Sequence, residues 1–432
     1  MPLLGTRGAA SAQAFGMFST TAGPYWIGVL AGSSSEDGFG IAVDNSGNVY
    51  LGNRSYSSPA GFSIVKYNRS GTIQWQRSLG GTLNDGCYGI AVDSSSNVYV
   101  VGYSSVQEIA LAKYDTSGTI QWQRRLGAAT GTHIGRNIAV DSSGNVYVVG
   151  ESFYSPDNVF EIAKYDTSGT IQWQRRLGNP GGSDYGYGIA VDSSGNVYVS
   201  GNLSTYNWGV AKYNTSGTIQ WQRSLGGYGV TTSSGAAVDS SGNVYVVGTS
   251  QGGNIEILLA KYNTSGTIQW QKTLGSPGYD RGYGIAVDSS GNVYINGSSD
   301  AGSTGVETFQ LAKYNTSGTI QWQRMLGRTS RPCIGYAVAT DSSGNVYVNG
   351  SMNNSGLTDI FFGKFPGNGS LTGGYNVGSY TNVYYVASSC TDAASTLTDA
   401  ASSGTDAAST LTDAASSLTD AASTLTSTIK QI

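Results

Sequence analysis

Residues 188–199 read Gly-Ile-Ala-Val-Asp-Ser-Ser-Gly-Asn-Val-Tyr-Val, two short apolar runs joined by a polar turn that contains glycine. Versions of this stretch occur seven times in the 432 residues of the chain. Its aspartate recurs at Asp44, Asp93, Asp141, Asp192, Asp239, Asp288 and Asp341. The intervals of 47 to 53 residues between these aspartates match the length of one blade of a β-propeller. The sequence therefore predicts a repeat array that closes on itself.

Each repeat divides into four short stretches with strand character. They are Gly-Ile-Ala-Val-Asp, Asn-Val-Tyr-Val-Val-Gly, a run that ends in Ala-Lys-Tyr, and Thr-Ile-Gln-Trp-Gln-Arg. The turns Asp-Ser-Ser-Gly-Asn and Thr-Ser-Gly place glycine where φ must be positive, so both predict tight hairpins. The predicted fold class is all-β, a seven-bladed propeller of four-stranded blades. The small apolar first strand suits the propeller axis, and the Trp strand suits the outer edge.

A tryptophan near the N-terminus predicts how the propeller closes. In six repeats a tryptophan follows the Lys-aromatic pair of the third strand by nine residues, whereas Lys364-Phe365 has no such tryptophan after it. Trp26, with Leu30 four residues later, repeats the spacing of Trp75 and Leu79. We therefore expect an N-terminal strand to complete the seventh blade beside Lys364. The tryptophans predicted to dock against the neighbouring blade are Trp26, Trp75, Trp122, Trp173, Trp221, Trp270 and Trp322.

The C-terminal residues change period from about fifty to seven. Thr391-Asp-Ala-Ala-Ser-Thr-Leu397 is repeated with small variations for six heptads up to Ile432, and leucine and alanine recur at core spacing. This pattern predicts a helical coiled coil that makes the protein an oligomer, with a trimer favoured. A disordered tail and a strap that docks on another protein remain alternatives. The predicted domains are an N-terminal arm (1–18), the propeller (19–375), a linker (376–390) and the heptad tail (391–432).

Charge and composition exclude several function classes. The formal net charge is -4 and no segment collects Lys or Arg, which argues against a nucleic-acid partner. The start of the chain has no signal-like apolar run, and no stretch is long enough to span a membrane, so synthesis in a cytoplasm is expected. His133 is the only histidine and the Asp-containing turns lack the ligand pattern of a calcium loop, so no metal or cofactor is predicted.

An enzymatic role is not predicted, with one alternative kept open. Four aspartates precede the first strand of their repeats at a nearly fixed offset and form a candidate acidic ring at one mouth of the channel: Asp37, Asp85, Asp184 and Asp280. Paired carboxylates of this kind are the minimum for glycan hydrolysis. Carboxylates that cap loops explain the same spacing without catalysis.

The loops that differ between repeats form the predicted binding surface. In a four-stranded meander the second and fourth connections lie on one face, and here these connections vary while the first and third stay nearly constant. They are rich in Tyr, Ser, Asn and Gly, the composition of an adaptable recognition surface. The candidate binding residues are Tyr56, Tyr154, Tyr206, Trp208, Tyr228, Tyr279 and Arg281. Drift in unconstrained loops would give the same variation.

Two resemblances add to this interpretation. The repeated Gly-Ile-Ala-Val-Asp-Ser-Ser-Gly-Asn-Val-Tyr-Val, with Ala-Lys-Tyr and Ser-Gly-Thr, resembles the bacterial β-propeller repeat family SBBP over about residues 20 to 371, which implies the fold and little about function. The opening Met1-Pro-Leu-Leu-Gly-Thr-Arg-Gly and the later Tyr25-Trp-Ile-Gly resemble the starts of structural proteins of marine tailed phages. This second resemblance implies a virion appendage such as a tail fibre, with other virion proteins and a host receptor or glycan as partners. A bacterial surface or secreted adhesin is the alternative.

Overall fold

The computed structural model of the chain describes most of the propeller and short segments of the tail. The described residues are 25–56, 61–80, 85–104, 107–128, 130–154, 157–178, 182–203, 207–226, 232–251, 254–300, 306–328, 331–354, 356–377, 380–387, 391–394, 398–401, 405–408, 412–415, 420–421 and 426–431. The predicted N-terminal arm, residues 1–18, lies outside these ranges.

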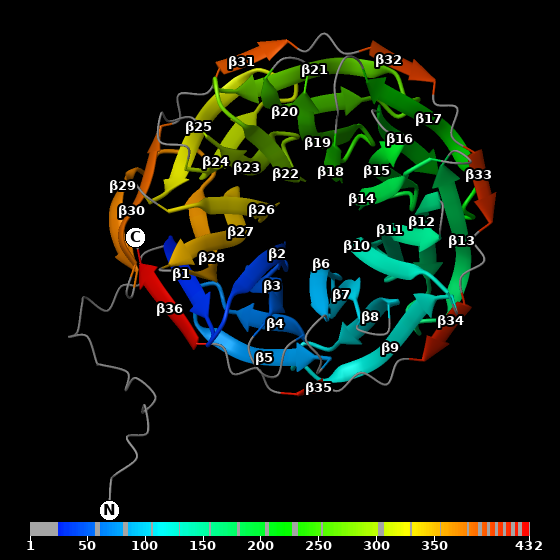
Figure 1. The fold of residues 1–432 in the computed structure, drawn as a ribbon, viewed down its shortest axis with the longest axis horizontal. Coiled ribbons are helices and arrows are strands. Elements are labelled where there is room, and N and C mark those ends of the chain that lie inside the picture. Colours follow the sequence, from blue (N-terminus) through cyan, green and yellow to red (C-terminus); the bar gives the residue numbers. More distant parts are fainter. Residues whose placement is uncertain are drawn as a thin grey trace, which may run out of the picture.

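The described residues form a ring of seven antiparallel sheets (Figure 1). The innermost strands are β2 (Glu36–Val43), β6 (Gly86–Val92), β10 (Thr132–Val140), β14 (Tyr185–Val191), β18 (Thr232–Val238), β22 (Asp280–Val287) and β26 (Cys333–Thr340). The second strands are β3 (Val49–Ser55), β7 (Val98–Tyr103), β11 (Val146–Tyr154), β15 (Val197–Leu203), β19 (Val244–Gln251), β23 (Val293–Ser299) and β27 (Asn345–Asn354). The third strands are β4 (Gly61–Tyr67), β8 (Ile109–Tyr114), β12 (Asp157–Tyr165), β16 (Asn207–Tyr213), β20 (Ile255–Tyr262), β24 (Thr308–Tyr314) and β28 (Leu357–Pro366). The fourth strands are β5 (Ile73–Leu79), β9 (Ile120–Gly127), β13 (Ile171–Gly178), β17 (Ile219–Gly226), β21 (Ile268–Gly275), β25 (Ile320–Gly327) and, for the seventh blade, β1 (Trp26–Ala31).

The N-terminal strand closes the ring, as the spacing around Trp26 predicted. β1 pairs antiparallel with β28, with Trp26 opposite Lys364 and Leu30 opposite Ile360. Side chains of blade 7 also reach blade 1 directly, since Asn349 Nδ2 donates to the Gly40 carbonyl at 2.8 Å. The seven-bladed propeller of four-stranded blades is therefore confirmed.

The nearly invariant turns join each blade to the next. In blade 2, Trp122 Nε1 donates to the Thr167 carbonyl of blade 3 at 3.1 Å, and Arg124 Nε donates to the Gly169 carbonyl of the same turn at 2.6 Å. Gly169 has φ 77°, and a Cβ there would lie 2.8 Å from the Trp122 ring, so only glycine fits. All seven tryptophans donate to a turn of the following blade in this way.

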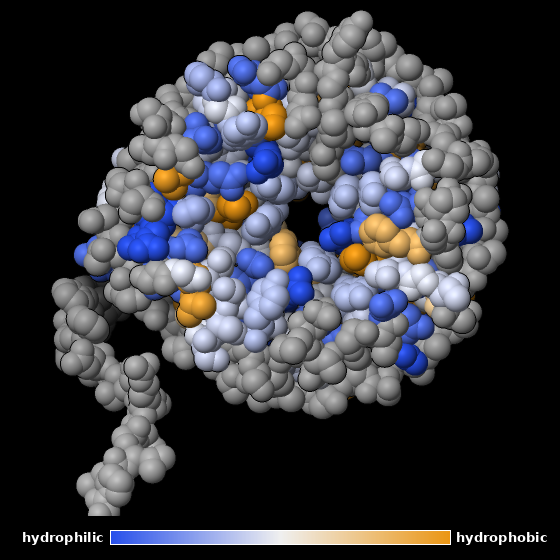
Figure 2. All heavy atoms as spheres, in the orientation of Figure 1, coloured by the Kyte–Doolittle hydropathy of each residue, from blue (hydrophilic) through white to orange (hydrophobic). Residues whose placement is uncertain are grey.

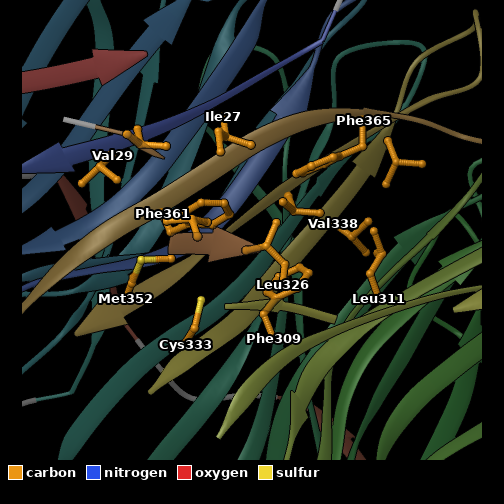
Figure 3. Packing of buried hydrophobic residues seen from close by; sticks show 14 of the residues in the cluster. Ile27, Val29, Phe309, Leu311, Leu326, Cys333, Val338, Met352, Phe361 and Phe365 are labelled. Carbon is orange, nitrogen blue, oxygen red and sulfur yellow. The ribbon is translucent and has the colours of Figure 1, made fainter. Parts of the chain in front are cut away.

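The core consists of apolar layers between neighbouring blades. Figure 3 shows the layer between blades 6 and 7, where Phe309 and Leu326 of blade 6 pack against Phe361 and Met352 of blade 7. The second strands each supply a tyrosine whose hydroxyl donates to the aspartate of the preceding turn. In blade 5, for example, the Tyr245 hydroxyl donates to Asp239 Oδ2 at 3.0 Å. Burial alone would raise the pKa of Asp239, but hydrogen bonds from Asn243, Tyr245 and the backbone outweigh it and hold that pKa below its ordinary value.

The prediction of a helical tail was wrong. The heptads form short strands, each added to the outer edge of a blade: β31 (Thr391–Ala394), β32 (Thr398–Ala401), β33 (Thr405–Ala408), β34 (Thr412–Ala415), β35 (Asp420–Ala421) and β36 (Thr426–Gln431). Thr, Asp and Ser are poor helix formers, while each blade offers an edge of unpaired backbone N–H and C=O groups. The predicted trimer depended on a helical coiled coil, so the described strands of the tail give it no support.

The segment predicted as a linker also pairs. β29 (Gly373–Val377) and β30 (Tyr380–Ala387) form a hairpin, and β30 pairs with β25 at the outer edge of blade 6. Within the described part of the chain, no helix has the length and apolar character needed to cross a membrane.

We expect Asp359→Asn to stabilise the protein at pH 8 and to have little effect at pH 4. Asp359 is 6% exposed in β28, and burial raises the pKa of its carboxyl to about 6. Because the folded-state pKa lies above the unfolded value, the native state loses stability as the pH rises from about 4 to about 6. Asparagine cannot ionise, so the gain at pH 8 should be roughly 1–3 kcal/mol by chemical unfolding. A gain of equal size at pH 4 would contradict this.

Candidate functional site

Each innermost strand carries a β-bulge at the same position. In β22 the pairing with β23 shifts between Gly282 and Gly284, so Tyr283 has no direct partner across the ladder. A bulge inserts one residue and re-aims its side chain. The bulged residues are Phe39, Tyr88, Arg136, Tyr187, Ser234, Tyr283 and Tyr336. We call this set the axial ring.

The axial ring lines a cavity on the propeller axis. All seven residues contribute to its wall, and its volume is about 430 Å³, within the range of small-molecule sites. Figure 2 shows the opening at the centre of the molecule. The innermost strands can surround the axis closely because glycines follow the bulges: a Cβ on Gly89 would lie 2.8 Å from Asn137 Cα of the next blade.

The ring is aromatic at five of its seven positions, and the two exceptions are Arg136 and Ser234. The centroid of Phe39 lies 5.0 Å from that of Tyr88 and 5.1 Å from that of Tyr336. Tyr336 in turn lies 5.2 Å from Tyr283, centroid to centroid. Blade 5, between Tyr187 and Tyr283, supplies only Ser234. The ring therefore has a wide side at blade 5.

Arg136 is the only charged residue among the described residues that line the cavity. Its Cζ lies 5.1 Å from the ring centroid of Tyr88 and 5.7 Å from that of Tyr187, so the guanidinium takes the place of an aromatic ring between them. Its Nε and one terminal nitrogen donate to Oε1 of Glu151, Nε at 3.0 Å. Glu151 is fully buried, and burial raises the pKa of its carboxyl against the opposing effect of Arg136. The ion pair therefore places the Arg136 guanidinium at the axis, where the Glu151 carboxylate balances its positive charge.

The phenol groups of Tyr187, Tyr283 and Tyr336 stay protonated. Burial raises the pKa of Tyr336 and Tyr187 well above the ordinary tyrosine value, helped by the charges of Asp37 and Glu151 respectively. Burial also raises the pKa of Tyr283. The cavity therefore presents aromatic faces and O–H groups that both donate and accept. Among the described residues of its wall, none is Asp or Glu.

A second hollow lies on the variable-loop face of blade 6. Its lining includes two of the predicted binding residues, Tyr279 and Arg281, with Asp300, Glu307 and Pro332. Arg281 donates to Glu307 Oε1 at 2.7 Å, and Tyr279 is 55% exposed. Arg281 and Tyr283 both belong to β22 and are two residues apart along it, so one strand contributes to both the hollow and the axial ring.

Those of the other predicted binding residues that the structure describes lie in different environments. Tyr56 is half-buried beneath Arg54, whose Cζ lies 4.4 Å from the Tyr56 ring centroid. Tyr154 ends β11, whereas Tyr206 and Tyr228 lie outside the described residues. Trp208 was predicted as an exposed loop aromatic, and this was wrong: it is fully buried in β16, opposite Asn202 and Leu225. The second connection is shorter than expected, so Trp208 belongs to the strand and points into the core.

The four aspartates do not line the axial cavity. Asp85, Asp184 and Asp280 are buried, and Asp280 Oδ2 accepts hydrogen bonds from Ser276 N at 2.7 Å and Ser276 Oγ at 3.0 Å. His133 takes the same place in blade 3, where its Nε2 accepts from Ala128 N at 3.1 Å. These side chains hold the end of the fourth strand to the start of the next blade. Within the described ranges no group of three or more His, Cys, Asp or Glu is placed to hold a metal ion.

Sequence reasoning missed the axial ring, although a signal was present. The residue before the repeated Gly-Ile-Ala-Val is Phe, Tyr, Arg, Tyr, Ser, Tyr or Tyr in its seven occurrences, counting Asn137 and Ala337 as replacements of the glycine. This position is aromatic in five repeats and polar in two. Such a pattern is the signal of an aromatic lining whose polar residues lie at particular blades.

Comparisons with known proteins support the fold. Five segments match the SBBP β-propeller repeat, at residues 74–109, 121–152, 172–202, 220–256 and 269–303. No curated protein matches the chain in sequence.

Among solved structures, YCF48 bound to D1 peptide has 12% identity and a TM-score of 0.47, covering 79% of this chain and 94% of that one. Sqt1 from Chaetomium thermophilum has 12% identity and a TM-score of 0.44, covering 82% of this chain and 97% of that one. XC5397 from Xanthomonas campestris, described as a gluconolactonase, has 10% identity and a TM-score of 0.39, covering 77% of this chain and 86% of that one. The sequence matches make this chain similar to SBBP repeat proteins in five segments, each of which begins in the fourth strand of one blade and continues into the next blade.

Proposed function

We propose that the chain is a recognition protein that binds a carbohydrate chain at the axial ring, and that it does not catalyse a reaction. The observation that carries the proposal is the ring itself, with five aromatic side chains, the hydroxyls of its tyrosines, and the small Ser234 at one position. The C–H faces of sugar rings pack against aromatic faces, while sugar hydroxyls exchange hydrogen bonds with phenols.

The electrostatics favour a neutral ligand over a charged one. A cationic ligand would compete with the Arg136 guanidinium for the faces of Tyr88 and Tyr187. An anionic ligand gains little, because Glu151 already compensates the charge of Arg136. Binding is proposed in place of hydrolysis because the described wall of the cavity carries no carboxylate that could act as acid or nucleophile.

The proposed location is a virion, in which the propeller acts as an appendage that meets a host-surface glycan and contacts other virion proteins. Its support is the resemblance of the N-terminal residues to phage structural proteins. A bacterial surface or secreted adhesin is the alternative, and mass spectrometry of purified particles distinguishes the two locations.

Replacing Tyr283 and Tyr336 together with Ala should weaken glycan binding by roughly 30-fold or more, because each supplies an aromatic face at the centre of the site. The measurement is calorimetry with oligosaccharides from host-surface polysaccharide. Tyr375→Ala is the matched control, since Tyr375 lies in β29 at the rim of the propeller and should leave affinity unchanged.

Ser234→Tyr tests the open side of the ring in the same titration. A tyrosine there should fill the gap and exclude the ligand. Unchanged affinity in the ring variants, with loss in Tyr279→Ala, would move the site to the blade 6 hollow. Release of reducing sugar during the titration would favour the hydrolase alternative.

A further inference from the structure

The tail adds one strand to the outside of every blade, and it visits the blades in reverse order. β30 pairs with blade 6, then β31, β32, β33, β34 and β35 pair with blades 5, 4, 3, 2 and 1. β36 ends the circuit on β1 of blade 7. We call the strands β30 to β36 the outer belt (Figure 1, orange to red around the rim).

The pairing register is the same in every blade. The residue opposite the leucine of the fourth strand follows a strict series: Tyr385 opposite Leu326, Asp392 opposite Leu274, Asp399 opposite Leu225, Asp406 opposite Leu177, Asp413 opposite Leu126, Asp420 opposite Leu79 and Ser427 opposite Leu30. Consecutive members of this series are seven residues apart, although the blades themselves are 47 to 53 residues long. The heptad is therefore the blade-to-blade step of the belt.

We propose a counting mechanism for the outer belt: its seven strands, β30 and one from each of the six heptads, match the number of blades, and only the two ends of the belt determine where each heptad docks. The Thr-Asp-Ala-Ala strands β31 to β34 have one sequence and meet nearly the same fourth strand, so nothing local distinguishes one blade from another. Strands of uniform sequence have a weakly specified register.

The two ends of the belt are distinct. β30 is held by its hairpin with β29, and β36 pairs with β1 over six residues, from Trp26 opposite Gln431 to Ala31 opposite Thr426. These ends meet on neighbouring blades, 6 and 7, after a full circuit. The belt thus covers the edge of the strand that closes the propeller, the one blade completed from both ends of the chain.

The length of the belt leaves little slack. Seven extended residues span at most roughly 23–25 Å. In the heptads of β31 to β34, four of the seven residues are used in pairing with a blade. If one heptad is missing, the remaining three-residue links cannot pass over an unpaired blade. Every later strand then moves back by one blade, and β1 is left without its partner.

The test compares three variants of the full chain by hydrogen exchange. Deleting residues 405–411 should speed exchange at β1 by roughly tenfold or more, while the edge of blade 3 stays protected by the next heptad. Asp406→Pro with Ala407→Pro keeps the length and removes backbone donors, so it should expose the edge of blade 3 and leave β1 protected. Exchanging residues 398–404 with 405–411 keeps both length and pairing and should change nothing.

A fourth variant keeps the test decisive if the deletion does not fold. Duplicating residues 405–411 removes no strand, but it should displace the last heptad beyond β1, so that trypsin cleaves after Lys430 faster than in the natural chain. Counting is refuted if the deletion exposes blade 3 and leaves β1 protected, or if duplication leaves cleavage at Lys430 unchanged.

Discussion

Arg136→Ala should lower the free energy of unfolding by about 3–5 kcal/mol, the usual cost of removing one partner of a buried ion pair. Glu151 is fully buried in β11, and its Oε1 accepts hydrogen bonds from Nε and a terminal nitrogen of Arg136. Its Oε2 is buried and accepts none. Without the guanidinium, the carboxylate would remain in the core with nothing to offset its desolvation. Chemical unfolding at pH 7.5 measures the loss.

The double variant Arg136→Ala, Glu151→Gln is the control. It removes the buried charge with its partner, so most of the loss should be recovered, because replacing both members of a buried pair is often neutral. The loss in the single variant should also shrink at low pH, since the pKa of Glu151 is raised and protonation discharges it. Equal losses in the single and double variants would show that Arg136 acts through packing alone.

In five blades the bulged residue is aromatic. In blade 3 it is the cation Arg136, which is paired with the buried carboxylate of Glu151. A tyrosine at position 136 would fit the pattern of the other blades without that carboxylate. In the proposed binding mode, the guanidinium gives the ring one polar side, between Tyr88 and Tyr187, that orients the ligand.

Much of the fold could be predicted because its signals are local and repeated. The two glycine-containing turns fix the hairpins, and the register of β1 on β28 follows from one misplaced tryptophan. The prediction for Trp208 was wrong because the length of one connection decides whether this residue lies in a loop or in a strand, and here it lies in a strand. The axial ring was missed because its members lie about fifty residues apart and meet only when the ring closes.

The heptad tail shows that a period does not by itself identify a structure. A seven-residue repeat of Leu and Ala suits a coiled coil, but here the same period equals one step around the rim. The composition was a signal against the helix, since Thr, Ser and Asp are poor helix formers. An added strand also requires a partner edge, which only the assembled propeller supplies.

Trp26→Ala should be the most damaging of the tryptophan substitutions, lowering the free energy of unfolding by about 3–5 kcal/mol. Trp26 has no exposed surface, and its ring lies 5.7 Å from Phe362 and 6.3 Å from Tyr67, centroid to centroid. Its Nε1 also donates to the Arg69 carbonyl of blade 1 at 3.3 Å. The substitution therefore opens a cavity in the strand that holds blade 7 to blade 1.

Trp122→Ala is the matched comparison, since Trp122 makes the equivalent bond to Thr167 at 3.1 Å but is only partly buried and lies inside a continuous blade. Less apolar surface is lost there, so its cost should be roughly half that of Trp26→Ala. Hydrogen exchange should separate the two further: Trp26→Ala should expose β1 and β28 selectively, because their pairing joins the two ends of the chain. Equal destabilisation, with exchange raised evenly over all blades, would mean that the closing strand is no weaker than any other.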